Sequence, residues 1–169
     1  MSDIHIRLAT EADIPAILKM GDEAVAWLAE RGRTGQWGTR TWTGNAATEE
    51  RMVKRLTSCE FYIAEIDGEP AGALAVGDHG QEYVPAADEP ELYVHFLITA
   101  GAFHGRQVGA TLLAHARERA IAWGVELVRV DCYGGDDRKL VAFYTSQGFE
   151  PIQTFTVKDW PGQLLGYRL

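Results

Sequence analysis

The chain has 169 residues, of which 46% are hydrophobic, enough to build a folded domain of ordinary size with a sizeable core. This composition excludes an intrinsically disordered chain, and no run approaches the roughly 20 apolar residues that span a bilayer. The formal net charge of −8 at pH 7 repels phosphate backbones, so a nucleic-acid partner is disfavoured.

The cysteines indicate a reduced compartment. Cys59 and Cys132 lie in neither a CxxC nor a metal-binding spacing. The first ten residues are charged and alternating, which is not typical of a signal peptide. We therefore expect a cytoplasmic protein with no metal, no disulfide framework and no membrane attachment.

The first third of the chain predicts a strand and two helices. Residues 4–9 alternate as a strand does. Thr10 and Asp13 form a capping signal for a helix that ends at Gly32, with Pro15 tolerated only in its first turn. A loop rich in Gly, Thr and Trp covers 33–47, and a short helix is expected at 48–58.

The middle of the chain predicts three strands. FYIAEI (61–66) and AGALAV (71–76) flank Asp67-Gly68, which is typical of a hairpin with a type I′ turn. A long acidic loop follows at 78–91, and LYVHFLIT (92–99) is the next strand.

The last third predicts two helices and three strands. A helix at 107–122 is closed by Gly124, and 126–133 forms a strand. Asp136 is expected to cap a helix that ends at Gly148. Strands near 152–157 and 163–168 then flank a predicted turn at Trp160-Pro161-Gly162. The element order predicts an α/β fold, a mixed sheet with helices on its faces.

A basic cluster stands out on this acidic chain, formed by His104, Arg106, His115, Arg117 and Arg119. It indicates either a small anionic ligand or a solvated helix face. HGRQVG (104–109) opens the third helix, and backbone N–H groups at a helix start can bind phosphate. An ordinary strand-to-helix turn is the alternative.

HGRQVG resembles the acetyl-CoA signature of the GNAT superfamily of N-acetyltransferases, a loop of the form R/Q-x-x-G-x-G/A. The segment DCYGGDDRKLVAFYTSQGFEPI (131–152) is similar to a second family element, in which a tyrosine precedes a closing Gly-Phe. Tyr144, Gly148 and Phe149 stand in those places. The resemblance covers essentially the whole chain. It implies one domain over 1–169, with a mostly antiparallel sheet of about seven strands and about four helices.

The resemblance implies that the main chain of the loop binds the pyrophosphate of acetyl-CoA. The residues concerned are His104, Gly105, Arg106, Gln107, Val108, Gly109 and Ala110. His104 stands where the family has Arg or Gln, and Gln107 replaces the first glycine. The Cβ of Gln107 limits how closely the phosphate can approach, and Arg106 could add a charge-assisted contact.

Other cofactor residues and the catalytic acid follow from the same resemblance. Leu97, Ile98 and Thr99 would hydrogen-bond the pantetheine arm, with a backbone N–H polarising the thioester carbonyl. Tyr144 would protonate the departing CoA thiolate, and Phe143 beside it is assigned to the cofactor. The alternatives are a plain core strand and a core aromatic residue.

A general base is needed because an amine is mostly protonated at pH 7. His95 lies just before the pantetheine segment, where some arylalkylamine acetyltransferases carry a histidine. A strand histidine with a satisfied partner is the alternative. Glu91, Asp78 and a water chain are rival bases.

The acceptor pocket is predicted at Trp37 and Trp42, which could wall a site for an apolar or cationic group or could anchor the loop in the core. We expect direct transfer to a primary amine, with a small molecule as acceptor. The alternatives are a protein lysine or N-terminus, a non-catalytic acyl-CoA-binding module and, less consistent with the charge, a toxin acting on charged tRNA. The resemblance further implies a homodimer.

Overall fold

The computed structural model describes residues 3–169 and has the expected order of helices and strands. The elements are β1 (Ile4–Leu8), α1 (Ile14–Glu30), α2 (Ala46–Ser58), β2 (Glu60–Ile66), β3 (Glu69–Gly77), β4 (Glu91–Thr99), α3 (Val108–Trp123), β5 (Leu127–Tyr133), α4 (Lys139–Ser146), β6 (Glu150–Val157) and β7 (Trp160–Arg168). Short 3₁₀ turns occur at Glu11–Asp13, Gly101–Phe103 and Asp136–Arg138.

The strands form a seven-stranded sheet in the order β1-β2-β3-β4-β5-β7-β6. The β4–β5 pair is parallel, whereas β1–β2, β5–β7 and β6–β7 are antiparallel. The prediction of a mixed, mostly antiparallel sheet with four helices is therefore confirmed.

The chain divides into two compact units, which we describe separately. The first contains the residues up to Ala75 together with Phe96–Leu112, and the second contains Val76–His95 together with Leu113–Leu169. The assignment of 1–169 to one domain stays a prediction.

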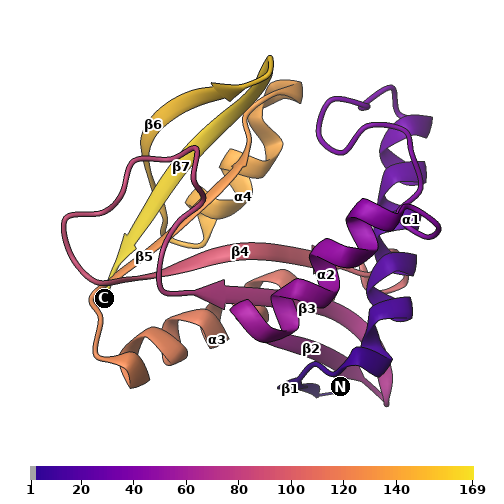
Figure 1. Ribbon diagram of the computed structural model, residues 1–169, viewed down its shortest axis with the longest axis horizontal. Helices are drawn as coiled ribbons and strands as arrows, with labels where there is room; N and C mark the ends of the chain where they lie inside the picture. Colours follow the sequence, from indigo (N-terminus) through magenta and orange to yellow (C-terminus); the bar gives the residue numbers. More distant parts are fainter. Residues whose placement is uncertain (1–2) are drawn as a thin grey trace. The chain divides into compact units, whose positions relative to one another are not determined.

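In the first unit, α1 and α2 lie side by side and α2 packs on β2 (Figure 1). Ile17, Met52 and Ile63, one from each of these elements, are almost fully buried in a shared apolar core. At the start of α1 the Asp13 carboxylate accepts the Thr10 N–H at 2.8 Å, as the capping signal predicted. The shared core holds α1 and α2 against β2, and the hydrogen bond between Thr10 and Asp13 stabilises the start of α1.

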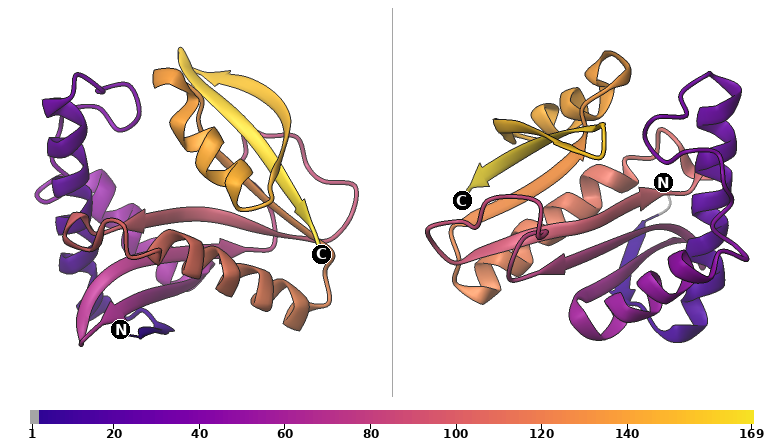
Figure 2. Two further views of the ribbon diagram at one scale, coloured as in Figure 1. Left: turned by 180° about the vertical axis from the view of Figure 1, so that it is seen from behind. Right: turned by 45° about the horizontal axis from the view of Figure 1, so that its top comes forward.

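In the second unit, α4 packs against β5 and β6, as both views in Figure 2 show. The expectation that Asp136 caps this helix is wrong. Asp136, Asp137 and Arg138 have left-handed backbones with φ of 52°, 60° and 61°. They form a 3₁₀ turn, so the helix begins only at Lys139.

The predicted turn at Trp160-Pro161-Gly162 is also wrong. The β6–β7 hairpin turns at Lys158 and Asp159, with φ of 47° and 67°, and Trp160 already pairs with Val157. Positive φ at both central residues is typical of a type I′ turn. Gly162 has a packing role, because a Cβ there would lie 2.3 Å from the Phe155 ring.

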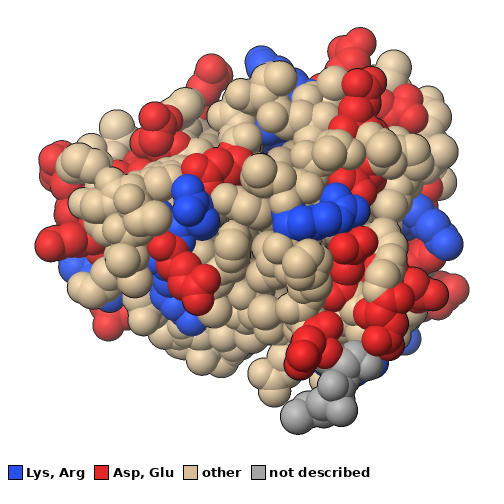
Figure 3. Space-filling model, turned by 90° about the horizontal axis from the view of Figure 1, so that it is seen from below, with Lys and Arg blue, Asp and Glu red and all other residues tan. Residues whose placement is uncertain are grey.

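The surface charges are mixed. On the face in Figure 3, Lys and Arg side chains lie among Asp and Glu side chains. Within residues 3–169, the helices are all too short or too polar to cross a bilayer.

Candidate active site

The start of α3, in the first unit, has backbone N–H groups without an intrahelical partner. The first helical bond of α3 runs from the Thr111 N–H to the Gln107 carbonyl at 3.0 Å. The N–H groups of Val108, Gly109 and Ala110 precede that bond, so helix geometry leaves them without an intrahelical acceptor. Residues 104–107 are exposed, which leaves the approach to these donors open to an anion.

Gln107, which stands where the signature has a glycine, has a backbone conformation that favours glycine. Its φ is +61°, in the left-handed region that glycine adopts at little cost. A residue with a Cβ is disfavoured there by roughly 1–2 kcal/mol. The loop therefore carries local strain at Gln107.

A close contact with β3 fixes the start of α3. Val108 is 1% exposed, and a Cβ on Gly72 would lie 2.7 Å from its Cγ1 and 2.8 Å from the Ile98 carbonyl oxygen. Only glycine lets β3 approach this closely, so Gly72 helps to hold the loop against the strands.

The end of β4 lies beyond its ladder with β5. That ladder runs from the Glu91–Leu127 pair to the Val94–Val130 pair, and the last five residues of β4 follow it. Among these, Ile98 is buried, whereas Leu97 and Thr99 are partly exposed. The structure thus places the predicted pantetheine segment at the end of β4, beyond its pairing with β5.

Tyr144 lies on α4 in the second unit and is 6% exposed. Its ring contacts Phe143 and Phe149, with centroid distances of 5.2 Å and 5.8 Å. Burial raises the pKa of the Tyr144 phenol, and the nearby Cys132 and Asp131 raise it further. Within residues 3–169 its hydroxyl makes no hydrogen bond to another residue, and it is not among the fully buried polar atoms that lack a partner. The group is a protonated donor available to a ligand.

His95 is oriented by the backbone of the 78–90 loop. Its Nε2 lies 2.8 Å from the His79 carbonyl oxygen, which can only accept, so Nε2 donates. In the neutral ring the lone pair is then on Nδ1. The ring also packs 5.2 Å from that of Tyr93. The hydrogen bond at Nε2 thus fixes the tautomer of the neutral ring.

The rival bases are less suited to proton transfer. Both oxygens of Glu91 accept from Arg129, at 2.5 Å and 2.9 Å, and the pair is buried. Arg129 also donates to the Pro85 carbonyl at 3.0 Å, so the pair ties the loop to the sheet. Asp78 is exposed, and a hydrogen bond from His79 lowers the pKa of its carboxyl, which makes it a weaker base.

Sequence reasoning missed Asp131 on β5. The Tyr93 hydroxyl donates to its Oδ1 at 2.5 Å and the Tyr83 hydroxyl to its Oδ2 at 2.9 Å. Burial raises the pKa of this carboxyl, although both tyrosines and His95 oppose the rise. An acidic residue between the apolar Val130 and Cys132 of a predicted strand was the only sequence signal for it.

The structure brings Trp37 and Trp42 together in the first unit, with ring centroids 5.3 Å apart. Trp42 is 9% exposed and packs so closely on α1 that a Cβ on Gly21 would lie 2.0 Å from its ring. Asp22 accepts the Trp42 N–H at 2.5 Å. Trp42 thus anchors the loop, whereas Trp37 is only partly buried. Their acceptor role stays a prediction.

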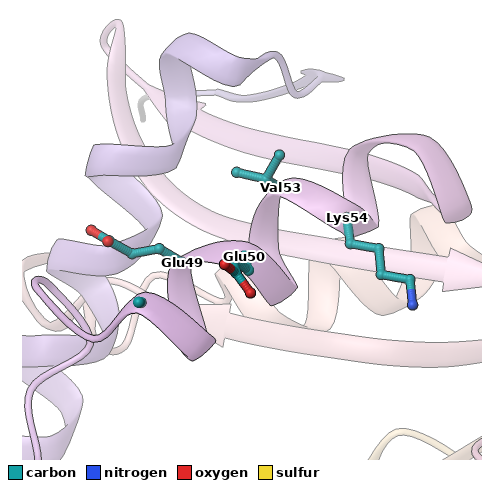
Figure 4. A pocket seen from close by; sticks show the side chains of 5 residues that line it. Glu49, Glu50, Val53 and Lys54 are labelled. Carbon is teal, nitrogen blue, oxygen red and sulfur yellow. The ribbon is translucent and has the colours of Figure 1, made fainter.

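A shallow hollow on α2 contains none of these residues. Figure 4 shows the side chains of Glu49, Glu50, Val53 and Lys54 spread outward around it. Its lining comes from one helix and has no convergent polar groups, so we assign it no function. Across the described part of the chain, no cluster of three His, Cys, Asp or Glu residues is suited to a metal ion.

The model of the acetyltransferase (GNAT) family matches residues 22–149, well over half of the chain. The chain belongs to the acetyltransferase (GNAT) family. No curated protein sequence matches this GNAT chain significantly.

Solved structures share the fold of this GNAT chain. A ribosomal-protein-alanine N-acetyltransferase from Brucella melitensis is 22% identical with a TM-score of 0.70, covering 98% of this chain and 99% of its own. YncA from Salmonella typhimurium, solved with its cofactor acetyl-CoA, is 19% identical with a TM-score of 0.66, covering 98% and 94%. PaiA N-acetyltransferase from Thermoplasma acidophilum, in complex with coenzyme A, is 16% identical with a TM-score of 0.70, covering 99% of both chains. Identities this low support the fold alone.

Proposed function

We propose that this GNAT chain transfers the acetyl group of acetyl-CoA to a primary amine by direct attack, with both substrates bound together. The observation that carries the proposal is the Tyr144 phenol, which is 6% exposed, stays protonated and makes no hydrogen bond to another residue within 3–169. It occupies the place of the proton donor in the family signature. The similar structures with acetyl-CoA and coenzyme A support the choice of acyl donor.

In this proposal the main chain of His104–Ala110 binds the pyrophosphate. The free N–H groups at the start of α3 and the helix dipole favour an anion there. The backbone of Leu97, Ile98 and Thr99 binds the pantetheine arm, and Phe143 contributes to the cofactor site. These backbone donors need no metal to hold the cofactor.

The proposed reaction proceeds by addition and elimination. The amine loses a proton to Nδ1 of His95 and attacks the thioester carbonyl carbon. The tetrahedral adduct then expels the sulfur, and the Tyr144 phenol donates its proton there. The second proton on nitrogen and the proton taken by His95 both leave to solvent, from which the phenol is restored. No covalent enzyme intermediate is required.

We propose a small-molecule amine as acceptor, bound next to Trp37 and Trp42, in a cytoplasmic homodimer with no nucleic-acid or membrane partner. The likeness to the Brucella ribosomal-protein-alanine N-acetyltransferase makes a protein N-terminus the second candidate. A protein lysine, and a non-catalytic acyl-CoA-binding module, remain the alternatives.

The test is thiol release from acetyl-CoA by the purified chain with a panel of primary amines and peptide N-termini. We expect amine-dependent thiol release and an acetylated product by mass spectrometry. Release with peptides alone would replace the small-molecule acceptor by a protein one. Binding of acetyl-CoA without thiol release for the whole panel would favour the binding module.

A further inference from the structure

Asp131 and His95 occupy matching positions at the end of a parallel ladder. The pairing of β4 with β5 ends at Val94 and Val130, and His95 and Asp131 are the next residues on the two strands. Side chains alternate along each strand, so residues at the same level of a parallel pair share a face of the sheet. Both residues belong to the second unit. The imidazole and the carboxylate are therefore expected on one face of that unit.

Tyr93 contacts both side chains. Its ring centroid lies 5.2 Å from that of His95, two residues further along β4. Its hydroxyl donates to Oδ1 of Asp131 at 2.5 Å. Arg129 also lies over the Tyr93 ring, at 5.5 Å, but its charge is paired with Glu91. One tyrosine thus joins the imidazole to the carboxylate on the shared face.

The bonding of Asp131 favours its ionised form. The carboxylate is only partly buried and accepts from Tyr93, from Tyr83 at 2.9 Å and from its own backbone N–H. Burial raises the pKa of this carboxyl, whereas these hydrogen bonds and the charge of His95 lower it. An interaction between two sites is reciprocal. The ionised carboxylate therefore favours protonated His95 as much as protonated His95 favours the carboxylate.

The other groups near His95 belong to the loop before β4. Nε2 of His95 donates to the His79 carbonyl at 2.8 Å, and the two rings lie 6.1 Å apart. The His79 ring bonds to Asp78 at 2.8 Å, and the charge of His95 contributes to the lowered pKa of Asp78. Asp78 is exposed, so solvent and salt screen its effect on His95. The partly buried Asp131 is screened less and is the stronger charge partner.

We propose that Asp131 is a positioning residue for His95, whose negative charge stabilises the imidazolium that forms when Nδ1 accepts a proton. That this proton comes from the acceptor amine rests on the proposed function, whereas the charge pair itself does not. An opposite charge nearby favours the charged form of a histidine, so the pair makes His95 a stronger base. The two tyrosines hold the carboxylate in place without adding charge.

The test follows the ring protons of His95 by NMR as the pH is changed, with the signal identified by its absence in His95→Gln. We expect Asp131→Asn to lower the pKa of His95 by about one unit, the smaller end of the effect of a nearby opposite charge. Asp88→Asn, which removes an exposed carboxylate from the loop before β4, should leave the His95 titration unchanged. The exposed His104 is an internal reference whose titration should not move in either variant.

A reciprocal measurement does not depend on the folding of Asp131→Asn. It follows the Asp131 carboxyl carbon by NMR in the parent and in His95→Gln. The carboxyl should titrate at higher pH in His95→Gln, because the cation that favours its ionisation is absent. An equal carboxyl titration in the two chains overturns the pair. So does a folded Asp131→Asn variant whose His95 pKa falls no further than in Asp88→Asn.

Thiol release separates the charge pair from the proposed function. In the pH profile of kcat/KM, the pKa of the base should fall in Asp131→Asn by the same amount as in the NMR titration of His95. A profile that stays in place while the NMR titration moves refutes His95 as the base and supports the pair. A chain that releases no thiol refutes the transfer, and the two NMR titrations still decide the pair.

Discussion

The Tyr93 hydroxyl donates a 2.5 Å hydrogen bond to the Asp131 carboxylate between neighbouring parallel strands, β4 and β5. Two residues before Tyr93, Glu91 forms a bidentate ion pair with Arg129 on the same two strands. Because side chains alternate along a strand, both pairs lie on one face of the sheet. On this face the Glu91 carboxylate pairs with an arginine, whereas the Asp131 carboxylate accepts from two phenols and has His95 nearby.

Asp131→Asn is expected not to lower the free energy of unfolding at neutral pH. Burial raises the pKa of this carboxyl in the folded state, so the folded chain binds its proton more readily than the unfolded chain. Stability therefore falls as the pH rises from the unfolded value of about 3.9 through the higher folded value. The asparagine side chain does not ionise, so the variant does not lose stability over this pH range. Urea unfolding at pH 4 and pH 7 measures the effect, and a variant markedly less stable than the parent at pH 7 would contradict it.

Glu91→Gln, unlike Asp131→Asn, should lower the free energy of unfolding at pH 7. It leaves the Arg129 guanidinium buried without its anion, and breaking a buried pair costs about 3–5 kcal/mol. The same urea series at pH 7 should show this loss as a lower midpoint with a similar slope. A loss below about 1 kcal/mol, the range of exposed pairs, would mean that solvent reaches the pair.

Gln107→Gly should preserve or strengthen acetyl-CoA binding. Glycine adopts the left-handed backbone of this residue without a cost of roughly 1–2 kcal/mol and removes a Cβ from the phosphate approach. The readout is the rise in melting temperature that acetyl-CoA gives by binding the folded state. Gly109→Val is the opposite control and should abolish the rise. Unchanged binding in Gly109→Val would show that the pyrophosphate binds elsewhere.

Trp37 and Trp42 should have different roles. We expect Trp42 to stabilise the fold and Trp37 to contribute to amine binding. Trp42→Ala removes a buried ring that packs on Gly21 and should lower the free energy of unfolding by about 3–5 kcal/mol. Trp37→Ala, at a partly exposed ring, should weaken use of the amine while leaving acetyl-CoA affinity near the parent value. Steady-state kinetics for each substrate, with a melting curve, tests both. Early unfolding in Trp37→Ala would make it a core anchor as well.

The sequence predicted the elements well because their signals are local. Periodicity, the capping residues around Asp13 and the Asp67-Gly68 turn each act within a few residues. Tyr144 and the 104–110 loop followed from the family resemblance. Asp131 could not be found in this way, because its burial and its bonds to Tyr83 and Tyr93 depend on contacts over long sequence distances. The failed turn at 160–162 has the same cause, since Gly162 serves the distant Phe155 ring.

Tyr144→Phe tests the proton donor with the least disturbance. The change keeps the ring and its contacts with Phe143 and Phe149 and removes only the hydroxyl. Because that hydroxyl has no partner among residues 3–169, its loss should leave the melting temperature and the acetyl-CoA affinity nearly unchanged.

The effect of Tyr144→Phe should fall on turnover instead. Burial, with Cys132 and Asp131 nearby, holds the pKa of the phenol above its ordinary value, so it stays protonated and can donate as charge grows on the sulfur. That hydrogen bond is strongest in the transition state, and a positioned proton donor contributes roughly 10²–10⁴-fold to the rate. A pre-steady-state measurement should first establish that the chemical step limits turnover. Turnover within about threefold of the parent under that condition would assign the sulfur's proton to water and leave Tyr144 a packing residue.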